Sequence, residues 1–136
     1  MGRRSFGLEV AVDEQTFELS LDPVLGAASE ARRATRRWLA DSTMSDALLD
    51  NLQLVISELV TNAVIHARTP LRLLVRFDGD RVLTEVFDAD VHLPTPAVSD
   101  DVGGWGLLLV DRLSDRWGSE PFTDGKRVWA ELTDAD

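Results

Sequence analysis

The chain has no cysteine, few histidines and a small share of basic side chains. Without cysteine it can form no disulfide framework, no thiolate nucleophile and no cysteine-based metal site. Its two histidines, His66 and His92, leave little for a histidine-rich metal centre. The 14 Lys+Arg against 24 Asp+Glu give a formal charge of −10. This balance argues against direct contact with nucleic acid or an anionic membrane, because those surfaces need clustered cations.

Long apolar runs are also missing. No continuous run approaches the roughly 20 residues that cross a bilayer. The first ten residues carry charge without the apolar stretch of a signal peptide. At 136 residues, with 44% hydrophobic and 28% charged side chains, the composition is typical of one globular domain with a real core. We therefore expect a soluble, cytoplasmic domain, with residues 1–15 as a flexible leader and 133–136 as an acidic tail.

The spacing of apolar residues predicts the order β-α-α-β-β-loop-α-β-β. Alternation indicates a strand over 16–21, and Asp22-Pro23 then resembles the N-cap and first position of a helix that runs to about Ala40. The other elements are predicted as a helix over Asp46–Ala67, strands over Leu71–Phe77 and 82–87, a helix over 107–113, and a hairpin of 117–122 with 127–132. This order favours an α+β two-layer sandwich, in which helices cover one face of a mixed, mostly antiparallel sheet.

Two polar side chains stand out on the helix expected over Asp46–Ala67. Glu58 and Asn62 are spaced i, i+4, so they lie on one stripe at the border of an apolar arc, and His66 continues that stripe one turn later. A carboxylate beside an amide can orient a hydroxyl group or help to hold a divalent cation. Oxygen ligands suit Mg²⁺, which takes the rest of its shell from water and substrate phosphates. Such pairs also occur as ordinary solvated residues, so the spacing alone does not decide.

Further candidates follow the expected hairpin of strands. Asp88 ends a strand, where its carboxylate can accept a hydrogen bond from an exocyclic amine. Gly103, Gly104 and Gly106 precede a helix, and free N–H groups at a helix N-terminus bind anions. The segment between them, 88–102, has two prolines, four aspartates and no Lys or Arg. It is expected to be a long loop, and loops of that length are often functional.

The familiar nucleotide motifs do not fit this chain. Gly125-Lys126 is followed by Arg127 and lies in a predicted hairpin turn, so it is not a P-loop. The pair Gly104 and Gly106 lacks the third glycine of a dinucleotide fingerprint and follows a loop instead of a strand.

The order of the candidates resembles a known superfamily. Residues 58–67, ELVTNAVIHA, look like the N box of the GHKL ATPases, which include gyrase, histidine kinases, mismatch-repair proteins and heat-shock chaperones. Asp88 falls at the place of the G1 aspartate, and 104–107 resemble the G2 box. The short length and the ending over 125–132 are similar to the anti-sigma factor serine kinases, especially the small stand-alone ATP-binding regulators abundant in actinobacteria. The resemblance covers about residues 16–132.

This resemblance implies a Bergerat ATP-binding fold that takes ATP or ADP with Mg²⁺. Glu58 would be the general base for a serine on a protein substrate, Asn62 would bind the metal, and Asp88 would accept from the adenine amine. Residues 89–102 would form a lid. The implied nucleotide-binding residues are Asn62, His66, Asp88, Gly103, Gly104, Gly106 and Leu107. The implied partners are an anti-anti-sigma (STAS-type) protein and a sigma factor, and such kinases are often homodimers.

Some residues depart from the family pattern and keep alternatives open. The G1 box is normally D-x-G-x-G, but Asp90 and His92 replace both glycines here, and Trp105 lies where close relatives often carry arginine. The chain is therefore either an active serine kinase that is also an anti-sigma factor or a degenerate protein-binding module with weak or no turnover. The catalytic domain of a histidine kinase is a less favoured alternative, because no helix pair with a phospho-acceptor histidine precedes the domain. No topoisomerase or chaperone is expected without a transducer domain.

One basic cluster interrupts the acidic sequence. It lies on the helix predicted after Asp22-Pro23 and consists of Arg32, Arg33, Arg36 and Arg37. It is either a solvated helix face or a docking surface for an acidic partner.

Overall fold

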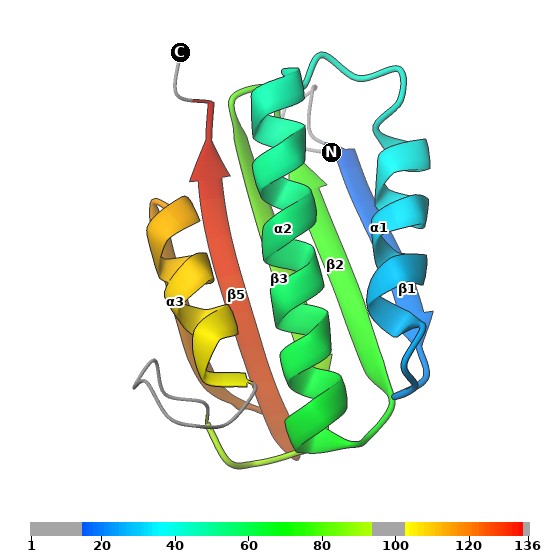
Figure 1. Cartoon of the computed structure of the whole chain (residues 1–136), viewed down its shortest axis with the longest axis vertical. Helices are drawn as coiled ribbons and strands as arrows, with labels where there is room; N and C mark the ends of the chain where they lie inside the picture. The colour runs from blue at the N-terminus through cyan, green and yellow to red at the C-terminus, as the bar shows by residue number, and fades with distance from the viewer. Residues whose placement is uncertain (1–14, 94–102, 135–136) are drawn as a thin grey trace, which may run out of the picture.

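The computed structural model describes residues 15–93 and 103–134, and Figure 1 shows their arrangement. Five strands and three α-helices follow in the predicted order, with a short π-helix, η1, at the end of the second helix. The elements are β1 Gln15–Leu21, α1 Ala27–Trp38, α2 Asp46–Asn62, η1 Ala63–Ala67, β2 Leu71–Phe77, β3 Arg81–Asp88, α3 Gly103–Leu113, β4 Arg116–Phe122 and β5 Gly125–Thr133.

The sheet has the strand order β1-β2-β3-β5-β4. Its four pairings are all antiparallel, so the sheet of the described residues contains no parallel pair. Figure 1 shows the three α-helices on one face, with α1 beside β1, α2 over β2 and β3, and α3 beside β5. The predicted α+β two-layer architecture is confirmed, but the prediction of a mixed sheet was wrong for the described residues, whose strands are all antiparallel to their neighbours.

Alternation along the strands decides which side chains face the helices. On β3, Val82, Thr84 and Val86 are buried, and their register partners on β5 are buried as well. The predicted apolar arc of α2 packs against this face, which builds the core. The buried residues of that arc are Leu48, Leu52, Val55, Ile56, Leu59 and Ala63.

The first helix begins later than the sequence predicted. Asp22-Pro23 is not its N-cap, because residues 22–26 form a turn in which Val24 N donates to Asp22 O and Ala27 N donates to Val24 O. The N-cap is Gly26. The chain needs this turn to pass from the end of β1 onto the helical layer, where Ala27 and Ala31 are buried.

The predicted ends of the domain shift slightly. Gln15, expected in the leader, belongs to β1, and Thr133, expected in the tail, belongs to β5. The remaining residues of the predicted leader and tail, 1–14 and 135–136, lie outside the described residues, as do 94–102 of the predicted lid.

The central helix, α2 with η1, begins at an N-cap hydrogen bond and ends at a residue in the left-handed conformation. Leu48 N donates to Ser45 Oγ at 3.1 Å, which satisfies a free N–H of the first turn. The span Asp46–Ala67 is long and apolar enough to meet simple criteria for a membrane helix. Half of it is buried in the fold, and a core helix accounts for its composition. Arg68, with φ at 58°, then takes the left-handed conformation that ends η1.

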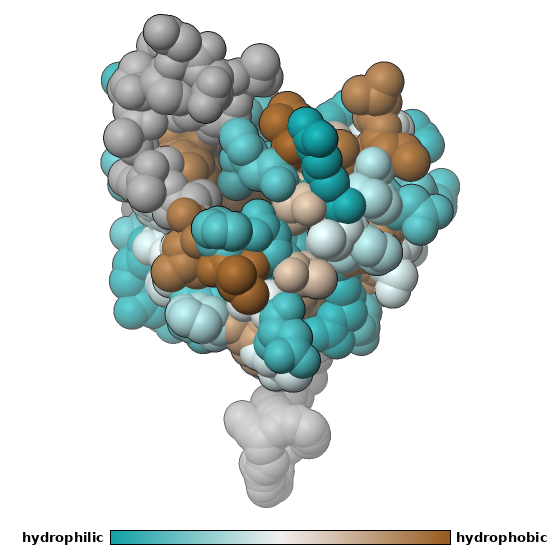
Figure 2. All heavy atoms as spheres, turned by 90° about the horizontal axis from the view of Figure 1, so that it is seen from below, coloured by the Kyte–Doolittle hydropathy of each residue, from teal (hydrophilic) through white to brown (hydrophobic). Residues whose placement is uncertain are grey.

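Several chain ends meet at one end of the sandwich. Leu71 opens β2 after a three-residue connection from η1, and the register places the end of β3 beside the start of β2 and the start of β5. The first turn of α3 lies at this same end in Figure 1. Figure 2 shows it from below, with polar and apolar side chains interspersed.

The face of the sheet without helices is held by ion pairs, which the sequence analysis did not predict. Glu85 is only 5% exposed and lies between Arg76, at 3.6 Å, and Arg127, at 2.5 Å. Glu131 pairs with both Arg81 and Arg116. These ion pairs link β2 with β3, β3 with β5, and β4 with β5, so that carboxylates and guanidinium groups neutralise each other on this face of the sheet.

Candidate functional site

The stripe of Glu58 and Asn62 lies on the flank of α2 that faces away from α1. Arg32 Nη1 donates to Ser57 Oγ at 2.7 Å, which marks the flank turned toward α1. At about 100° per residue, Asn62 lies roughly 140° around the helix from Ser57. It therefore faces the side on which α3 packs against α2.

The three side chains predicted on this stripe differ in exposure. Asn62 is buried at 6% exposure, Glu58 is half-buried, and His66 is exposed on η1. Glu58 can thus reach solvent or a partner, while Asn62 is held in place by its burial. Their roles stay predictions.

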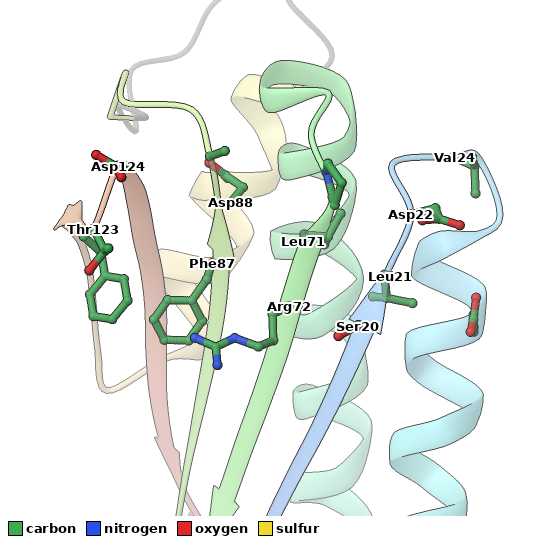
Figure 3. A pocket seen from close by; sticks show the side chains of 14 residues that line it. Ser20, Leu21, Asp22, Val24, Leu71, Arg72, Phe87, Asp88, Thr123 and Asp124 are labelled. Carbon is green, nitrogen blue, oxygen red and sulfur yellow. The ribbon is translucent and has the colours of Figure 1, made fainter.

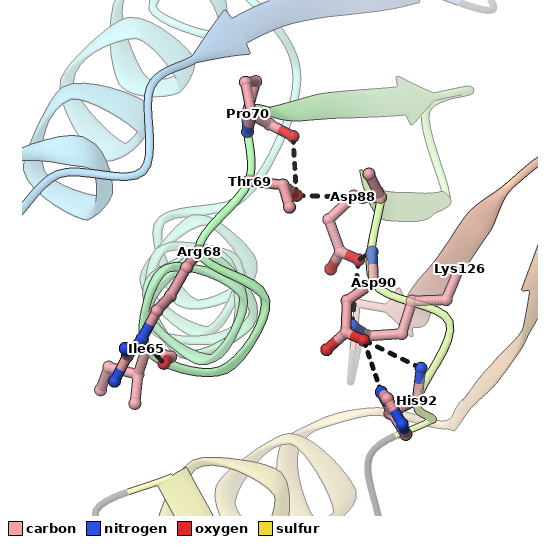
Figure 4. A network of polar contacts seen from close by, with 9 residues as sticks. Ile65, Arg68, Thr69, Pro70, Asp88, Asp90, His92 and Lys126 are labelled. Atoms are coloured by element: carbon pink, nitrogen blue, oxygen red, sulfur yellow. Dashed lines mark hydrogen bonds and ion pairs between the residues drawn. The ribbon is translucent and has the colours of Figure 1, made fainter.

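Asp88 belongs to the helix-covered face at the end of β3. Lys126 is its register partner on β5, and alternation places both side chains on the same face as the buried pair Val86 and Val128. Lys126 Nζ lies 3.0 Å from Asp88 Oδ1, and the two side chains are 3% and 1% exposed. Figure 4 shows this buried ion pair.

The second carboxylate oxygen of Asp88, Oδ2, differs from the first because it makes no hydrogen bond to the described residues. Asp88 Oδ2 is buried and has no hydrogen-bond partner among the described residues. A buried polar atom left unpaired costs about 1–3 kcal/mol, and such atoms are rare in folded proteins. A ligand that donates a hydrogen bond would satisfy it. The exocyclic amine of adenine is such a donor, so the residues present fit the base that the family resemblance implies.

The two residues at the expected glycine positions join the same network. Asp90 N donates to Asp88 Oδ1 at 2.9 Å, and Asp90 Oδ2 lies 3.6 Å from Lys126 Nζ. Asp90 Oδ1 accepts from His92 N at 3.0 Å and contacts His92 Nδ1 at 2.9 Å. The backbone hydrogen bond from His92, with its side-chain contact, lowers the pKa of Asp90 to about 2.

Neither position needs the freedom of glycine in this fold. Among the described residues, the non-glycine positions with positive φ are Arg68, Thr123 and Asp124. Asp90 and His92 therefore adopt ordinary backbone conformations, and the departure from the G1 pattern is accommodated without strain at these two positions.

A short link ties the N-box helix to the segment after Asp88. Ala89 N donates to Thr69 Oγ1 at 3.0 Å, and this hydroxyl donates to Pro70 O at 3.3 Å. Since Thr69 follows η1 by two residues, the end of the N box and the end of β3 are fixed against each other (Figure 4). The structure thus brings together the two segments that carry Asn62 and Asp88.

The predicted glycine-rich segment begins the third helix. We expected Gly103, Gly104 and Gly106 to precede a helix over 107–113, but α3 starts at Gly103, so they occupy its first turn. The N–H groups of a first turn have no intrahelical partner. Leu107 is 3% exposed and belongs to the core, so its side chain has little surface left for a ligand.

A cavity of about 590 Å³ lies at the same end of the sheet (Figure 3). It reaches from Phe87 and Arg72 on the uncovered face to Val24 and Glu30 on the α1 side. Asp88 lines it, but Glu58, Asn62 and His66 do not. Sequence reasoning missed this cavity because its walls come from the ends of separate elements that no motif marks.

The residues described offer no complete metal site of their own. Within 15–93 and 103–134, no group of three or more His, Asp or Glu side chains is placed to hold a metal ion. A Mg²⁺ ion here would depend on Asn62 and on ligand phosphates, which is how this ion is usually held beside nucleotides.

Comparison with known proteins identifies the family. Residues 21–131 match the histidine kinase-like ATPase domain. The chain belongs to this family. Membership of the histidine kinase-like ATPases implies nucleotide binding, generally with Mg²⁺, and agrees with the open acceptor on Asp88.

A solved structure shares the fold of this family member. It is the structure of the RsbU and RsbW domains of Rv1364c from Mycobacterium tuberculosis, with a TM-score of 0.68 and 21% sequence identity. The match covers 88% of this chain and 32% of that chain, so this chain spans about a third of the length of the solved chain. No curated protein matches the sequence.

Proposed function

We propose that this histidine kinase-like ATPase domain binds ATP or ADP with Mg²⁺ and acts as an anti-sigma-factor-like regulator. The site would lie among η1, the end of β3 and the first turn of α3. The observation that carries the proposal is Asp88 Oδ2, a buried acceptor with no partner among the described residues, at the strand end where an adenine amine would donate.

The proposed roles follow the position of each side chain. Asp88 would accept from the base, Asn62 would hold Mg²⁺, and His66 with Gly103, Gly104 and Gly106 would line the phosphates. ATP, when bound, would supply the phosphoryl group for a partner's serine. Glu58, half-buried on the α3 flank, would accept the proton of that serine hydroxyl. Catalysis of this kind rests on positioning and charge neutralisation, which need few residues.

The proposed partners are an anti-anti-sigma (STAS-type) protein, a sigma factor, or both, met in the cytoplasm, with a homodimer as the working form. The shared fold with a structure that contains an RsbW domain supports a regulatory setting. The exposed arginines of α1 are the proposed contact for an acidic partner surface.

A second candidate function is a protein-binding module without turnover. Two cations that could have met a phosphate are already engaged. Lys126 lies between the carboxylates of Asp88 and Asp90, and Arg68 Nε donates to Ile65 O. Phosphoryl transfer normally needs such charge beyond the metal ion, so binding of nucleotide without efficient transfer is consistent with this geometry.

Calorimetric titration tests the nucleotide proposal. We would titrate the protein with ADP and with a non-hydrolysable ATP analogue, with and without Mg²⁺, and repeat this with Asp88→Asn. The matched control is Asp50→Asn, an exposed carboxyl on α2. We expect micromolar, Mg²⁺-dependent binding that Asp88→Asn weakens at least about tenfold and Asp50→Asn leaves unchanged. No binding at millimolar nucleotide would overturn the proposal and favour the protein-binding module.

A further inference from the structure

The cavity of about 590 Å³ at the end of the sheet is separate from most of the proposed nucleotide site, since none of the side chains proposed for Mg²⁺ or proton transfer lines it. Its size lies within the range of cavities that hold ligands. Figure 3 shows Asp124 on one side of it and Asp22 on the other, with Phe87 and Leu71 between them. A ligand that spans the cavity therefore meets carboxylates at both ends and apolar side chains in the middle.

The carboxylates around this cavity have no counter-charge in the described part of the chain. Asp22, Glu30 and Asp124 line the cavity and are exposed, and within residues 15–93 and 103–134 none of them forms an ion pair or a side-chain hydrogen bond. Arg72 also lines the cavity, but its Nη1 already donates to Glu18 at 3.0 Å. Three carboxylates around one recess create a negative potential that attracts cations.

An aromatic pair forms part of the cavity wall. The ring centroids of Phe87 and Phe122 lie 4.9 Å apart, and the guanidinium of Arg72 lies 4.6 Å from the centroid of Phe87. Phe122 is 42% exposed, so part of its ring is uncovered. It lies two residues before Asp124 in the turn between β4 and β5. A cation from a ligand can stack on Phe122 and pair with Asp124, as Arg72 stacks on Phe87 and pairs with Glu18.

Exposed apolar side chains border the cavity beside α1. Val24 lines the cavity and is 56% exposed, and Leu25, next to it in the same turn, is 99% exposed. Figure 2 shows apolar surface beside polar side chains at this end of the molecule. Exposed apolar side chains that gather around a recess often mark a contact with another protein. A small amine inside the cavity would leave Leu25 uncovered, whereas a protein with a segment in the cavity would cover it.

The strand order sets the distance between the two acidic ends. Asp124 directly precedes β5 and Asp22 directly follows β1, and β3 and β2 lie between these two strands. Three spacings of about 4.8 Å between neighbouring strands make about 14 Å. An extended chain covers this distance in about four residues, and its side chains at i, i+2 and i+4 point to the same side. The matching segment has a basic residue at i, an apolar residue at i+2 and a second basic residue at i+4.

We propose that this cavity docks an extended, basic segment of a partner protein. Two Lys or Arg side chains of that segment, four residues apart, would meet Asp22 and Asp124, and the apolar side chain between them would meet Phe87 and Leu71. The inference goes beyond the proposed function, because it requires neither bound nucleotide nor the arginines of α1.

The test titrates the ¹⁵N-labelled protein with the capped peptide Arg-Ser-Leu-Ser-Arg and follows the backbone amide shifts. We expect a Kd below about 1 mM at low salt, weaker binding at high salt, and shifts gathered at the end of β1 and in the β4–β5 turn. The double variant Asp22→Asn with Asp124→Asn should bind the peptide about fivefold more weakly. The matched control, Asp50→Asn with Asp134→Asn, removes the same charge from exposed positions elsewhere and should bind as wild type does. A peptide with serine in place of leucine should bind about threefold more weakly.

Three results would overturn the proposal. Equal weakening in the two double variants would mean a general attraction to an acidic protein. Absence of shifts around the cavity at millimolar peptide would mean that the cavity takes no such segment. Spermidine that binds as tightly as the peptide and shifts the same amides would mean a site for a small polyamine instead of a protein. ADP affinity should be unchanged in Asp22→Asn with Asp124→Asn, so failure of this proposal and failure of the nucleotide proposal are distinguishable.

Discussion

A β-carbon placed on Gly125 would lie 1.9 Å from the main-chain oxygen of Asp88 and 2.9 Å from Cα of Ala89. The contact is with backbone atoms, which cannot swing aside as a flexible side chain would. Gly125 opens β5, one residue before Lys126, so this close approach also sets the position of the Lys126–Asp88 ion pair.

Gly125→Ala should therefore lower stability and disturb the ligand site together. The added methyl forces the start of β5 away from the end of β3, which costs about 1–3 kcal/mol or more. Gly26→Ala is the matched control, because a β-carbon there meets nothing within 4 Å and its φ of −81° suits any residue. Denaturant unfolding and ADP titration of both variants check this. Equal stability of the two would contradict the described approach of the strands.

Replacement of Glu58 should separate chemistry from recognition. If Glu58 is the base for a partner's serine, Glu58→Ala lowers the rate of phosphorylation by at least about 100-fold and leaves the affinity for that partner unchanged. The half-buried position of Glu58 on the rim of α2 makes a large loss of stability unexpected. Phosphoserine on the purified partner protein, followed by mass spectrometry, is the measurement.

A matched control variant sharpens the Glu58 experiment. Asp50→Ala removes another carboxyl from α2, two turns earlier and exposed, and should leave the rate unchanged. If wild type and Glu58→Ala both bind the partner and neither yields phosphoserine in the presence of bound nucleotide, the protein-binding module is the better description.

Much of the fold was predictable because its signals are local. The apolar arc of α2 and the alternation in β1 are periodic patterns of contiguous residues, and the structure has those elements close to the predicted positions. The predicted start of α1 was wrong, because Asp22-Pro23 is compatible with a turn as well as with a helix N-terminus. The path of the chain from β1 to the helical layer, which the local sequence does not show, requires the turn. The ion pairs around Glu85 join three strands, and no local pattern reveals a register.

In the candidate site, too, local sequence signals were predictive and contacts between distant residues were not. Glu58, Asn62 and Asp88 were found by spacing and by the order of family motifs. The partner of Asp88 was not, because Lys126 is 38 positions away and becomes its neighbour only through the β3–β5 register. In the sequence, Asp90 and His92 were interpreted only as departures from the two glycines of the G1 box. In the structure they bind each other and occupy ordinary backbone conformations, which a motif written in glycines cannot show.

Acid should weaken the contribution of Asp90 to stability. Hydrogen bonds from His92 lower its pKa from 3.8 to about 2 in the folded protein. A lowered pKa means that the stabilisation is fully present above the unfolded value and is lost as the pH falls through the folded one. The difference in Tm between wild type and Asp90→Asn should thus be constant above about pH 5 and shrink as the pH falls toward 2.

The measurement is the Tm of wild type and of Asp90→Asn, taken from thermal melts between neutral pH and about pH 2. Asp134→Asn, which removes an exposed carboxyl after β5, controls for the general loss of one negative charge. A difference that grows as the pH falls would have the wrong sign and would contradict the described contacts between Asp90 and His92.

The arginines of α1 differ from those of the sheet. Arg72, Arg76, Arg81, Arg116 and Arg127 each pair with a glutamate. Arg33, Arg36 and Arg37 are exposed and take part in no ion pair within the described part of the chain. In a protein of formal charge −10, free positive charge on one helix is available to a partner of opposite sign.

Reversal of charge at Arg33 and Arg36 should therefore weaken partner capture without unfolding the domain. Rim charges act mainly on the rate of association and on its salt dependence. We expect the double variant Arg33→Glu with Arg36→Glu to bind the partner about tenfold more weakly at low salt, with a smaller difference at high salt. Arg112→Glu, an exposed arginine on α3, is the control for charge alone. Surface plasmon resonance at two ionic strengths gives both rates, and an unchanged affinity in the double variant would leave α1 as a solvated face.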